Sequence, residues 1–198
     1  MQLTSFTFFF AFLPASLLLL LLLRKKLPGQ NAALLILSVF FCAASGLAGF
    51  LAGLLETLAV YALALILARA DRPKARKTVF TLGVLFCAGL LCYFKYTNFL
   101  LGALSLPTVS LLPAPLGVSF LTFLLISYLA DVYRKTAEYE PSFVNFAMYI
   151  SMFPQLIAGP IVTYSSIKKE ISRRSHSMRA VEEGLKTFTI GLGLKVLL

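Results

Sequence analysis

The amino-acid sequence predicts an all-α, polytopic membrane protein with about six to seven membrane segments. Hydrophobic residues make up 59% of the 198 residues and charged residues only 13%, and the mean hydropathy is +0.88. Several apolar runs approach the roughly 20 residues that a helix needs to cross a hydrocarbon core of about 30 Å. These runs are continuous, whereas the strands of a transmembrane barrel would alternate apolar and polar residues. The composition therefore argues against both a soluble domain and a barrel.

The first three segments are predicted at residues 4–23, 32–46 and 52–69. A basic cluster at residues 24–26 follows the first run and no basic residue precedes it. Because positive charges mark the cytoplasmic ends of membrane segments, the N-terminus is expected on the other side, outside the cytoplasm. Residues 27–31 are predicted to form a turn, since they contain Pro28 and Gly29. Glu56 is expected near the outer end of the third segment.

A second basic cluster, at residues 69–77, precedes a fourth segment predicted at 78–98, and Pro73 discourages a continuous helix through this cluster. Lys95 follows the cluster by about 27 Å along a helix that rises about 1.5 Å per residue. It is therefore expected near the outer membrane interface, among aromatic residues. Residues 100–113 carry no charge and contain two prolines, which predicts an external loop, and the fifth segment at 115–132 returns inward.

The apolar run at residues 142–163 contains prolines and a glycine that break a helix. A complete crossing would place the basic residues between 168 and 179 outside, against the positive-inside rule. A re-entrant or broken helix keeps all the basic clusters on the cytoplasmic side, and we predict this arrangement. Residues 165–180 are then a basic, Ser-rich cytoplasmic segment, in which Ser177 is expected to cap a final helix that begins at Met178.

Four residues of this broken segment are the leading functional candidates: Pro154, Gln155, Gly159 and Pro160. Backbone groups without helical partners persist at membrane depth only where they are packed in protein or line a polar cavity. One interpretation is a cavity or tunnel in which Gln155 offers its amide to a substrate. The other is a packing kink between helices that contacts no ligand.

Lys95, Tyr128, Asp131 and Arg134 are further candidates for lining a substrate path. Ionisable residues in a membrane often mark such a path, although Lys95 has the alternative of extending its amine to the membrane surface. Asp131 and Arg134 have the spacing of a pair on one helix face, or of charges that anchor a cytoplasmic helix end. Tyr128 is either a hydrogen-bonding site residue or an interfacial anchor.

No residue of the sequence is identified as catalytic or as a metal ligand. Cys42, Cys87 and Cys92 all lie in apolar runs and are expected to be small buried side chains, without the spacing of a metal site. His176, the only histidine, stands among arginines and serines, where a solvated loop is a simpler reading than a general base.

The stretch from Pro115 to Tyr164 carries a resemblance to a known family. The resemblance is to the membrane-bound O-acyltransferases, and it rests on PLGVSFLTFLLISYLADVYR followed by NFAMYISMFPQLIAGPIVTY. It is greatest for the bacterial branch that contains the alginate O-acetyltransferase. Residues 5–14, 94–99 and 167–198 share in it, so that it covers essentially the whole chain.

This resemblance implies an O-acetyltransferase component of a bacterial inner membrane. Such a component takes acetyl from acetyl-CoA and delivers it across the membrane to an alginate-like exopolysaccharide or to peptidoglycan. A periplasmic acetyl-transferring protein is the implied partner, with membrane lipid but no nucleic acid, and no cofactor is expected to be bound.

The family's catalytic histidine lies in a later, Trp-His-Gly-like setting that no position here matches. Residues 1–198 are therefore expected to be the N-terminal part of one multispan domain, truncated at its C-terminus and inactive alone. Two other functions fit the same residues: a transporter or flippase built on a broken helix, and a membrane subunit without catalytic activity.

Overall fold

The regular structure of the chain is helical wherever it is described. The computed structural model describes residues 5–23, 26–44, 46–159, 161–174 and 177–197, and these residues contain no strand. The elements are the π-helix η1 (Phe8–Phe12) and the α-helices α1 (Leu13–Leu22), α2 (Leu27–Ala43), α3 (Leu47–Arg69), α4 (Pro73–Ala103), α5 (Val118–Arg134), α6 (Phe143–Ser151), α7 (Phe153–Ala158), α8 (Tyr164–Ser172) and α9 (Met178–Leu197). The predicted all-α class is confirmed.

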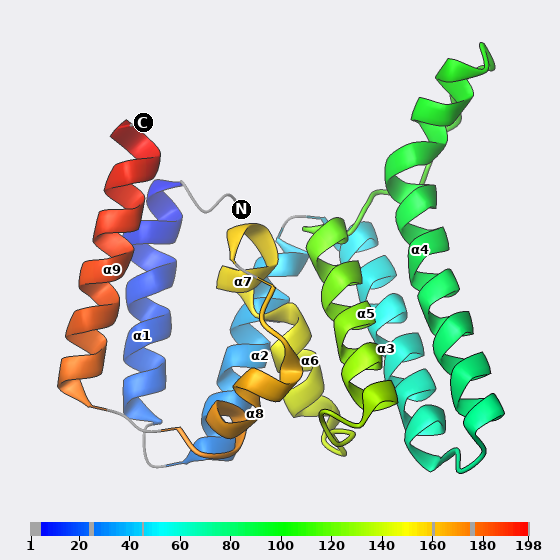
Figure 1. Ribbon diagram of the computed structural model, residues 1–198. Coiled ribbons are helices and arrows are strands. Elements are labelled where there is room, and N and C mark those ends of the chain that lie inside the picture. Colours follow the sequence, from blue (N-terminus) through cyan, green and yellow to red (C-terminus); the bar gives the residue numbers. More distant parts are fainter. Residues whose placement is uncertain (1–4, 24–25, 45, 160, 175–176, 198) are drawn as a thin grey trace.

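The long helices stand roughly parallel to one another (Figure 1). Helices α1 and α9 form one side of the molecule, α2 and α6 the middle, and α3, α5 and α4 the other side. Within this arrangement α4 packs against α5, α5 against α3, and α2 against α6. The ring of Phe9 in η1 lies 6.0 Å from the ring of Phe188 in α9, which joins the two ends of the chain.

One end of the helix bundle carries most of the basic residues. The α1–α2, α3–α4 and α5–α6 connections and helix α8 all lie at the lower end in Figure 1. The basic residues in these segments or in the adjoining helix ends are Lys26, Arg69, Arg72, Lys74, Arg76, Lys77, Arg134, Lys135, Lys168, Lys169, Arg173 and Arg174. We call this the basic end. Such a concentration is what the positive-inside rule requires of a cytoplasmic end.

Helix α5 lies at the centre of the apolar core. Leu124, Leu125 and Leu129 are each at most 1% exposed and belong to the largest buried cluster. Gly83 of α4 allows a close approach to α5, since a Cβ atom there would lie 2.8 Å from Leu129 Cδ1. Because α5 is packed on several sides, it fixes the positions of the shorter helices that follow it.

Arg76 joins α3, α4 and α5 at the basic end. Its guanidinium donates to Leu67 O at 2.8 Å, and to Val132 O and Tyr133 O at 2.9 Å each. These carbonyls belong to the last turns of α3 and α5, where carbonyls lack partners within their own helix. A cation also interacts favourably with the C-terminal end of a helix dipole.

Two helices, α3 and α4, are long and apolar enough to cross a membrane, as judged by length and composition in the described residues. Only 11% of the apolar 18-residue stretch of α4 is buried, and its side chains Leu82, Leu85 and Phe99 are exposed. A core helix of a soluble protein would instead be mostly covered. The shorter apolar helices at Phe8–Leu22 and Leu27–Ala43 do not reach the same length. The predicted number of membrane segments remains a prediction.

Pro28 and Pro73 stand in the first turns of α2 and α4. A first-turn residue needs no backbone N–H for the helix ladder, so proline is well suited there. The predicted turn at residues 27–31 is therefore wrong, because these residues lie in α2. The prediction that Pro73 discourages a continuous helix is confirmed, since α3 ends at Arg69 and a new helix, α4, begins at Pro73. Helix α4 also extends to Ala103, beyond the predicted end of the fourth segment at residue 98 and into the predicted loop at 100–113.

Helix α8 (Tyr164–Ser172) covers the first half of the segment at 165–180, which was predicted only as basic and Ser-rich. The cap predicted at Ser177 is confirmed, because its Oγ accepts a hydrogen bond from the Ala180 N–H at 3.1 Å. His176 lies outside the described residues. Of the cysteines, Cys42 and Cys87 are buried as expected, whereas Cys92 is exposed and its predicted burial is wrong.

Glu56 lies deeper in the bundle than the sequence suggested. Helix α3 begins at Leu47, five residues before the predicted start at 52, so Glu56 is about 14 Å inside the helix end at about 1.5 Å per residue. Its side chain is buried, with 1% exposure. The expectation that it lies near the outer end is therefore wrong.

Candidate functional site

The break predicted in the segment at residues 142–163 is present, between α6 and α7. Helix α6 ends at Ser151, Met152 has a non-helical backbone with φ of −49° and ψ of 110°, and α7 begins at Phe153. Pro154 occupies the first turn of α7, so it starts the second helix and does not itself interrupt the first. The Phe153 N–H, freed by the break, donates to Ser38 Oγ of α2 at 3.3 Å. A neighbouring helix thus supplies the partner that the broken helix lacks.

After α7 the chain turns back toward the basic end. Gly159 is extended, and residues 161–163 lead to α8, which lies at the same end as the α5–α6 connection (Figure 1). The Tyr149 hydroxyl on α6 donates to Val162 O at 2.8 Å and so holds the returning, non-helical segment against α6. This path is compatible with the predicted re-entrant segment.

Gln155 is the polar residue of the break that faces the interior. Its side chain is 7% exposed, and its Nε2 atom has no hydrogen-bond partner among the described residues. Pro154 beside it is exposed. Gly159 is half-buried, and a Cβ atom there would lie 2.7 Å from Gln155 Cα, which excludes a larger residue. Pro160, the fourth candidate of this segment, lies outside the described residues.

A small apolar cavity lies next to the break. Its volume is about 60 Å³, and it is lined by residues of α2, α3, α5, α6, α7 and the segment before α5. Ser151 at the end of α6 and Leu156 of α7 both line it. Thr57 of α3 and Ser151 are polar residues in an otherwise apolar wall. The cavity is therefore suited to a small, mostly apolar group.

Glycines bring the walls of this cavity close together. Gly117, the residue before α5, has a left-handed backbone with φ of 62°, and a Cβ atom there would lie 2.3 Å from Leu156 O. Gly49 of α3 similarly approaches Ala114 O, at 2.5 Å from where its Cβ would be. Only glycine permits both the backbone conformation and the contact at Gly117. The break in the helix is thus held against α5 by direct backbone packing.

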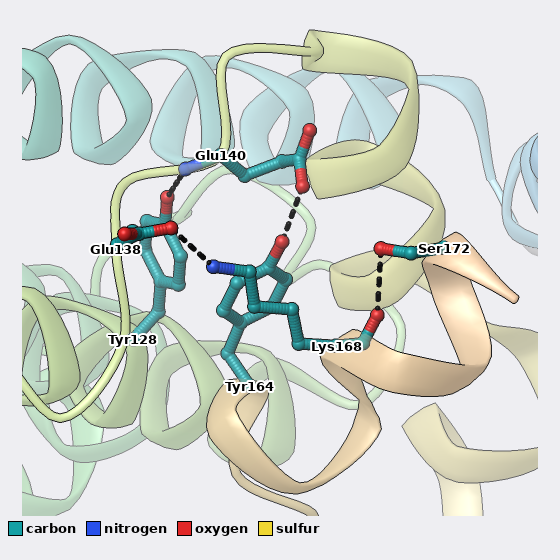
Figure 2. A network of polar contacts seen from close by, with 6 residues as sticks. All are labelled: Tyr128, Glu138, Glu140, Tyr164, Lys168 and Ser172. Atoms are coloured by element: carbon teal, nitrogen blue, oxygen red, sulfur yellow. Dashed lines mark hydrogen bonds and ion pairs between the residues drawn. The ribbon is translucent and has the colours of Figure 1, made fainter.

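A second polar centre lies at the basic end and is built around Glu140 (Figure 2). The Tyr164 hydroxyl donates to Glu140 Oε2, and the Glu140 N–H donates to the Tyr128 hydroxyl at 3.0 Å. The Ser142 N–H and Asn145 Nδ2 donate to Glu140 Oε1 at 3.0 and 3.2 Å. These bonds connect α5, α6 and α8, so they fix the two ends of the broken segment relative to each other.

The network continues to α2 through two amide side chains. Asn31 Nδ2 donates to Asn145 Oδ1 at 3.0 Å and to Ile171 O at 3.1 Å. Arg174 in turn donates to Asn31 Oδ1 at 3.4 Å. Sequence reasoning missed Glu140, Asn31 and Asn145. The available signal was that acids and amides adjoin or interrupt apolar runs, where polar groups must find partners.

The electrostatics of this centre follow from burial and from one ion pair. Burial raises the pKa of Tyr164 above its ordinary value, and the hydrogen bond to Glu140 raises it further, so the hydroxyl remains a donor. Lys168 Nζ lies 2.8 Å from Glu138 Oε2 (Figure 2), and this contact lowers the pKa of the exposed Glu138 carboxyl. Among the described residues there is no cluster of three or more side chains that would hold a metal ion.

The remaining sequence candidates are not gathered at the break. Tyr128 and Asp131 lie in the C-terminal half of α5, with Asp131 about 21 Å along the helix from Gly117 at about 1.5 Å per residue. Asp131 accepts hydrogen bonds from Thr136 Oγ1 at 3.0 Å and from the Ser165 N–H at 3.3 Å. In the part of the chain that is described, no ion pair joins it to Arg134, which is exposed.

Lys95 lies in the exposed outer half of α4. Its Nζ donates to Ser119 Oγ of α5 at 3.4 Å and lies 5.7 Å from the centre of the Tyr96 ring. The structure therefore separates the candidates into an inner group at the break, a group at the basic end, and Lys95 on the α4–α5 face.

Comparison with known proteins supports the resemblance on which the sequence analysis relied. The chain is 33% identical over 134 residues to a protein named probable alginate O-acetylase AlgI from Pseudomonas aeruginosa, which covers 63% of this chain and 26% of that protein. The Azotobacter vinelandii protein of the same name is also 33% identical over 134 residues, with 63% and 27% coverage. A peptidoglycan O-acetyltransferase from Helicobacter pylori is 31% identical over 161 residues, with 64% and 30% coverage.

The matched region is only a part of each relative. The chain spans between about a quarter and a third of the length of these curated proteins. No family model matches the chain, and no solved structure matches it.

Proposed function

We propose that this chain is part of a membrane-bound O-acetyltransferase that transfers acetyl groups to hydroxyls of a cell-envelope polymer. The observation that carries the proposal is its similarity to proteins named for the acetylation of two different polymers, alginate and peptidoglycan. What the two names share is O-acetylation of a polymer. The reaction class in this proposal is therefore O-acetylation of a polymer. The proposed acceptor is an alginate-like exopolysaccharide or peptidoglycan.

The donor in this proposal is acetyl-CoA, bound from the cytoplasm at the basic end. Lys169, Arg173 and Arg134 are exposed at this end, and they attract the phosphates of the coenzyme. The same charges would orient the chain in an inner membrane with its N-terminus periplasmic. The exposed apolar side chains of α4 would then contact membrane lipid.

The α6–α7 break supplies the contact with the transferred group. An unpartnered amide N–H group inside a protein is costly, and a carbonyl oxygen of a substrate would satisfy Gln155 Nε2. The adjacent cavity of about 60 Å³ accommodates a group of acetyl size. The polar centre around Glu140 would hold the break in place while the substrate binds and leaves. A periplasmic acetyl-transferring protein would receive the acetyl group on the outer side.

The experiment measures acetyl transfer in membrane vesicles that carry this chain, expressed from its complete gene. Vesicles with the cytoplasmic side outward are supplied with acetyl-CoA labelled in the acetyl group, and polymer fractions are assayed for alkali-labile label. Acetyl transfer that depends on the gene is expected. Movement of a polymer or lipid that needs no acetyl-CoA would instead establish a transporter. Equal label with and without the gene would refute an acetyltransferase role.

A further inference from the structure

Glu56 is a buried acid that the proposed site does not use. It lies in α3 with 1% exposure, and Thr122 Oγ1 of α5 donates to its Oε1 atom at 3.1 Å. Its other oxygen, Oε2, has no hydrogen-bond partner among the described residues. In the described part of the chain, no lysine or arginine forms an ion pair with it.

An ionised carboxylate in this setting would be expensive. Burying a charge without a cation costs several kcal/mol, and one hydroxyl donor does not compensate for it. A neutral carboxylic acid costs much less, and a proton is the smallest partner that the unpartnered oxygen can take. We propose that Glu56 is a proton-binding site inside the helix bundle.

The groups around Glu56 are consistent with a site for a single proton. Among the described residues, Cys87 of α4 is a titratable group that interacts electrostatically with Glu56, and its thiol is buried and carries no positive charge. From α5 the facing group is the neutral Thr122 hydroxyl. On α3 itself the neighbouring Thr57 hydroxyl is occupied, because it donates to Gly53 O at 2.7 Å. None of these groups supplies a compensating positive charge.

Polar side chains of α5 and α4 lie between Glu56 and the outside of the bundle. Thr122 and Ser119 are three residues apart on α5, so they lie on one helix face about 4.5 Å apart along the axis. Ser119 Oγ accepts a hydrogen bond from the exposed Lys95 Nζ at 3.4 Å. This order, Lys95, Ser119, Thr122 and Glu56, assigns the route by which the proton exchanges with solvent.

Such a site has a place in the chemistry, in an argument that rests on the proposed function. Acetyl transfer from a thioester to a hydroxyl breaks a C–S bond, forms a C–O bond and moves the hydroxyl proton to the thiolate. When the hydroxyl is outside and the thiol inside, each transfer releases one proton outside and takes up one proton inside, and a proton that passes inward balances the two. In this proposal Glu56 binds that proton during its passage from the outer surface to the interior.

The test is infrared spectroscopy of the chain in lipid nanodiscs at neutral pH, without an acetyl donor or acceptor. The spectrum should contain a carbonyl band of a protonated carboxylic acid that is lost in Glu56→Gln. Thr122→Val removes the hydrogen bond to this carboxyl and should move the band to higher frequency. Thr57→Val is the matched control, because its hydroxyl bonds the backbone and not Glu56, and it should leave the band in place.

Two results would overturn the inference. A wild-type spectrum without the band, or a band that persists unchanged in Glu56→Gln, would show that Glu56 holds no proton. The route is tested separately by the rate at which the band shifts after transfer to D₂O. Ser119→Ala should slow this exchange, and Thr97→Ala, whose hydroxyl bonds Tyr93 O of its own helix, should not. Equal rates in wild type and Ser119→Ala would overturn the route. Since no acetyl chemistry is involved, these outcomes are independent of the acetyltransferase test.

Discussion

Replacing Gly117 with alanine tests whether the α6–α7 break is held against α5 by backbone contact. The new Cβ atom would lie 2.3 Å from Leu156 O, and the residue would keep a φ of 62°. The left-handed conformation costs a non-glycine residue roughly 1–2 kcal/mol. Relieving the overlap requires α7 to shift, and overpacking of this kind costs roughly 1–3 kcal/mol. We expect Gly117→Ala to lower the free energy of unfolding by about 2–5 kcal/mol.

Two other glycines separate the contributions to this loss. At Gly46 φ is 142° and nothing lies within 4 Å of the added Cβ, so Gly46→Ala measures backbone strain without overlap. Gly89 is in the middle of α4 with open space around it, and Gly89→Ala should raise the stability by up to about 1 kcal/mol, since alanine favours helix. Only Gly117→Ala should combine both penalties.

The protein offers its own probes for this assay. Cys42 and Cys87 are buried, while Cys92 is exposed. A thiol-reactive fluorophore should therefore label Cys92 at once and the two buried thiols only as the protein unfolds on heating. The expected order of midpoints is Gly89→Ala highest and Gly117→Ala lowest. A Gly117→Ala protein as stable as Gly89→Ala would refute the reasoning about the break.

Three further substitutions test the contacts at the basic end. Arg76→Met removes three bonds to helix-end carbonyls and should cost about 2–4 kcal/mol in the thiol assay, with a midpoint equal to that of wild type as the contrary result. Tyr164→Phe removes the donor to the buried Glu140 carboxylate and should cost about 1–3 kcal/mol; an unchanged midpoint would show that the bond contributes nothing. Glu138→Gln should lower the unfolding midpoint slightly near neutral pH and not in acid. The reason is that Lys168 lowers the pKa of the Glu138 carboxyl below its ordinary value of 4.5. Stability from a lowered pKa is present above the ordinary value and is lost as the pH falls through the lowered one, so the midpoints of wild type and variant should converge in acid. A difference that grows below pH 4.5 would contradict this.

The helical class and most segment positions could be predicted from the sequence because they depend on local properties. Long apolar runs and basic clusters are visible in the sequence, and so are the prolines of the broken segment. The start of α3 was placed too late because small residues such as Gly49 look like a turn. In the structure they are needed where α3 approaches Ala114 closely. That error of a few residues also hid the depth of Glu56.

The polar centre could not be predicted because its contacts join distant positions. Tyr164 and Glu140 are 24 residues apart, and Asn31 and Asn145 are 114 apart. A sequence pattern reports which residues need partners but not which partners they meet. Gln155 was predicted because its neighbours Pro154 and Gly159 mark a local break. The separation of Tyr128 and Asp131 from that break depends on the packing of α5, which no local pattern encodes.

The rate of acetyl transfer in Gln155→Leu tests the central claim, that the α6–α7 break contacts the transferred group. It would be measured in vesicles that carry the chain expressed from its complete gene. Loss of one substrate hydrogen bond of about 1.5 kcal/mol corresponds to a fall of about tenfold. Pro154→Ala is the matched control, since Pro154 is adjacent but exposed, and it should retain most of the rate. The account predicts that Gln155→Leu loses about tenfold in rate, while its unfolding midpoint is no lower than that of wild type, because the substitution removes an unpartnered buried amide. Transfer at the wild-type rate by Gln155→Leu would contradict it.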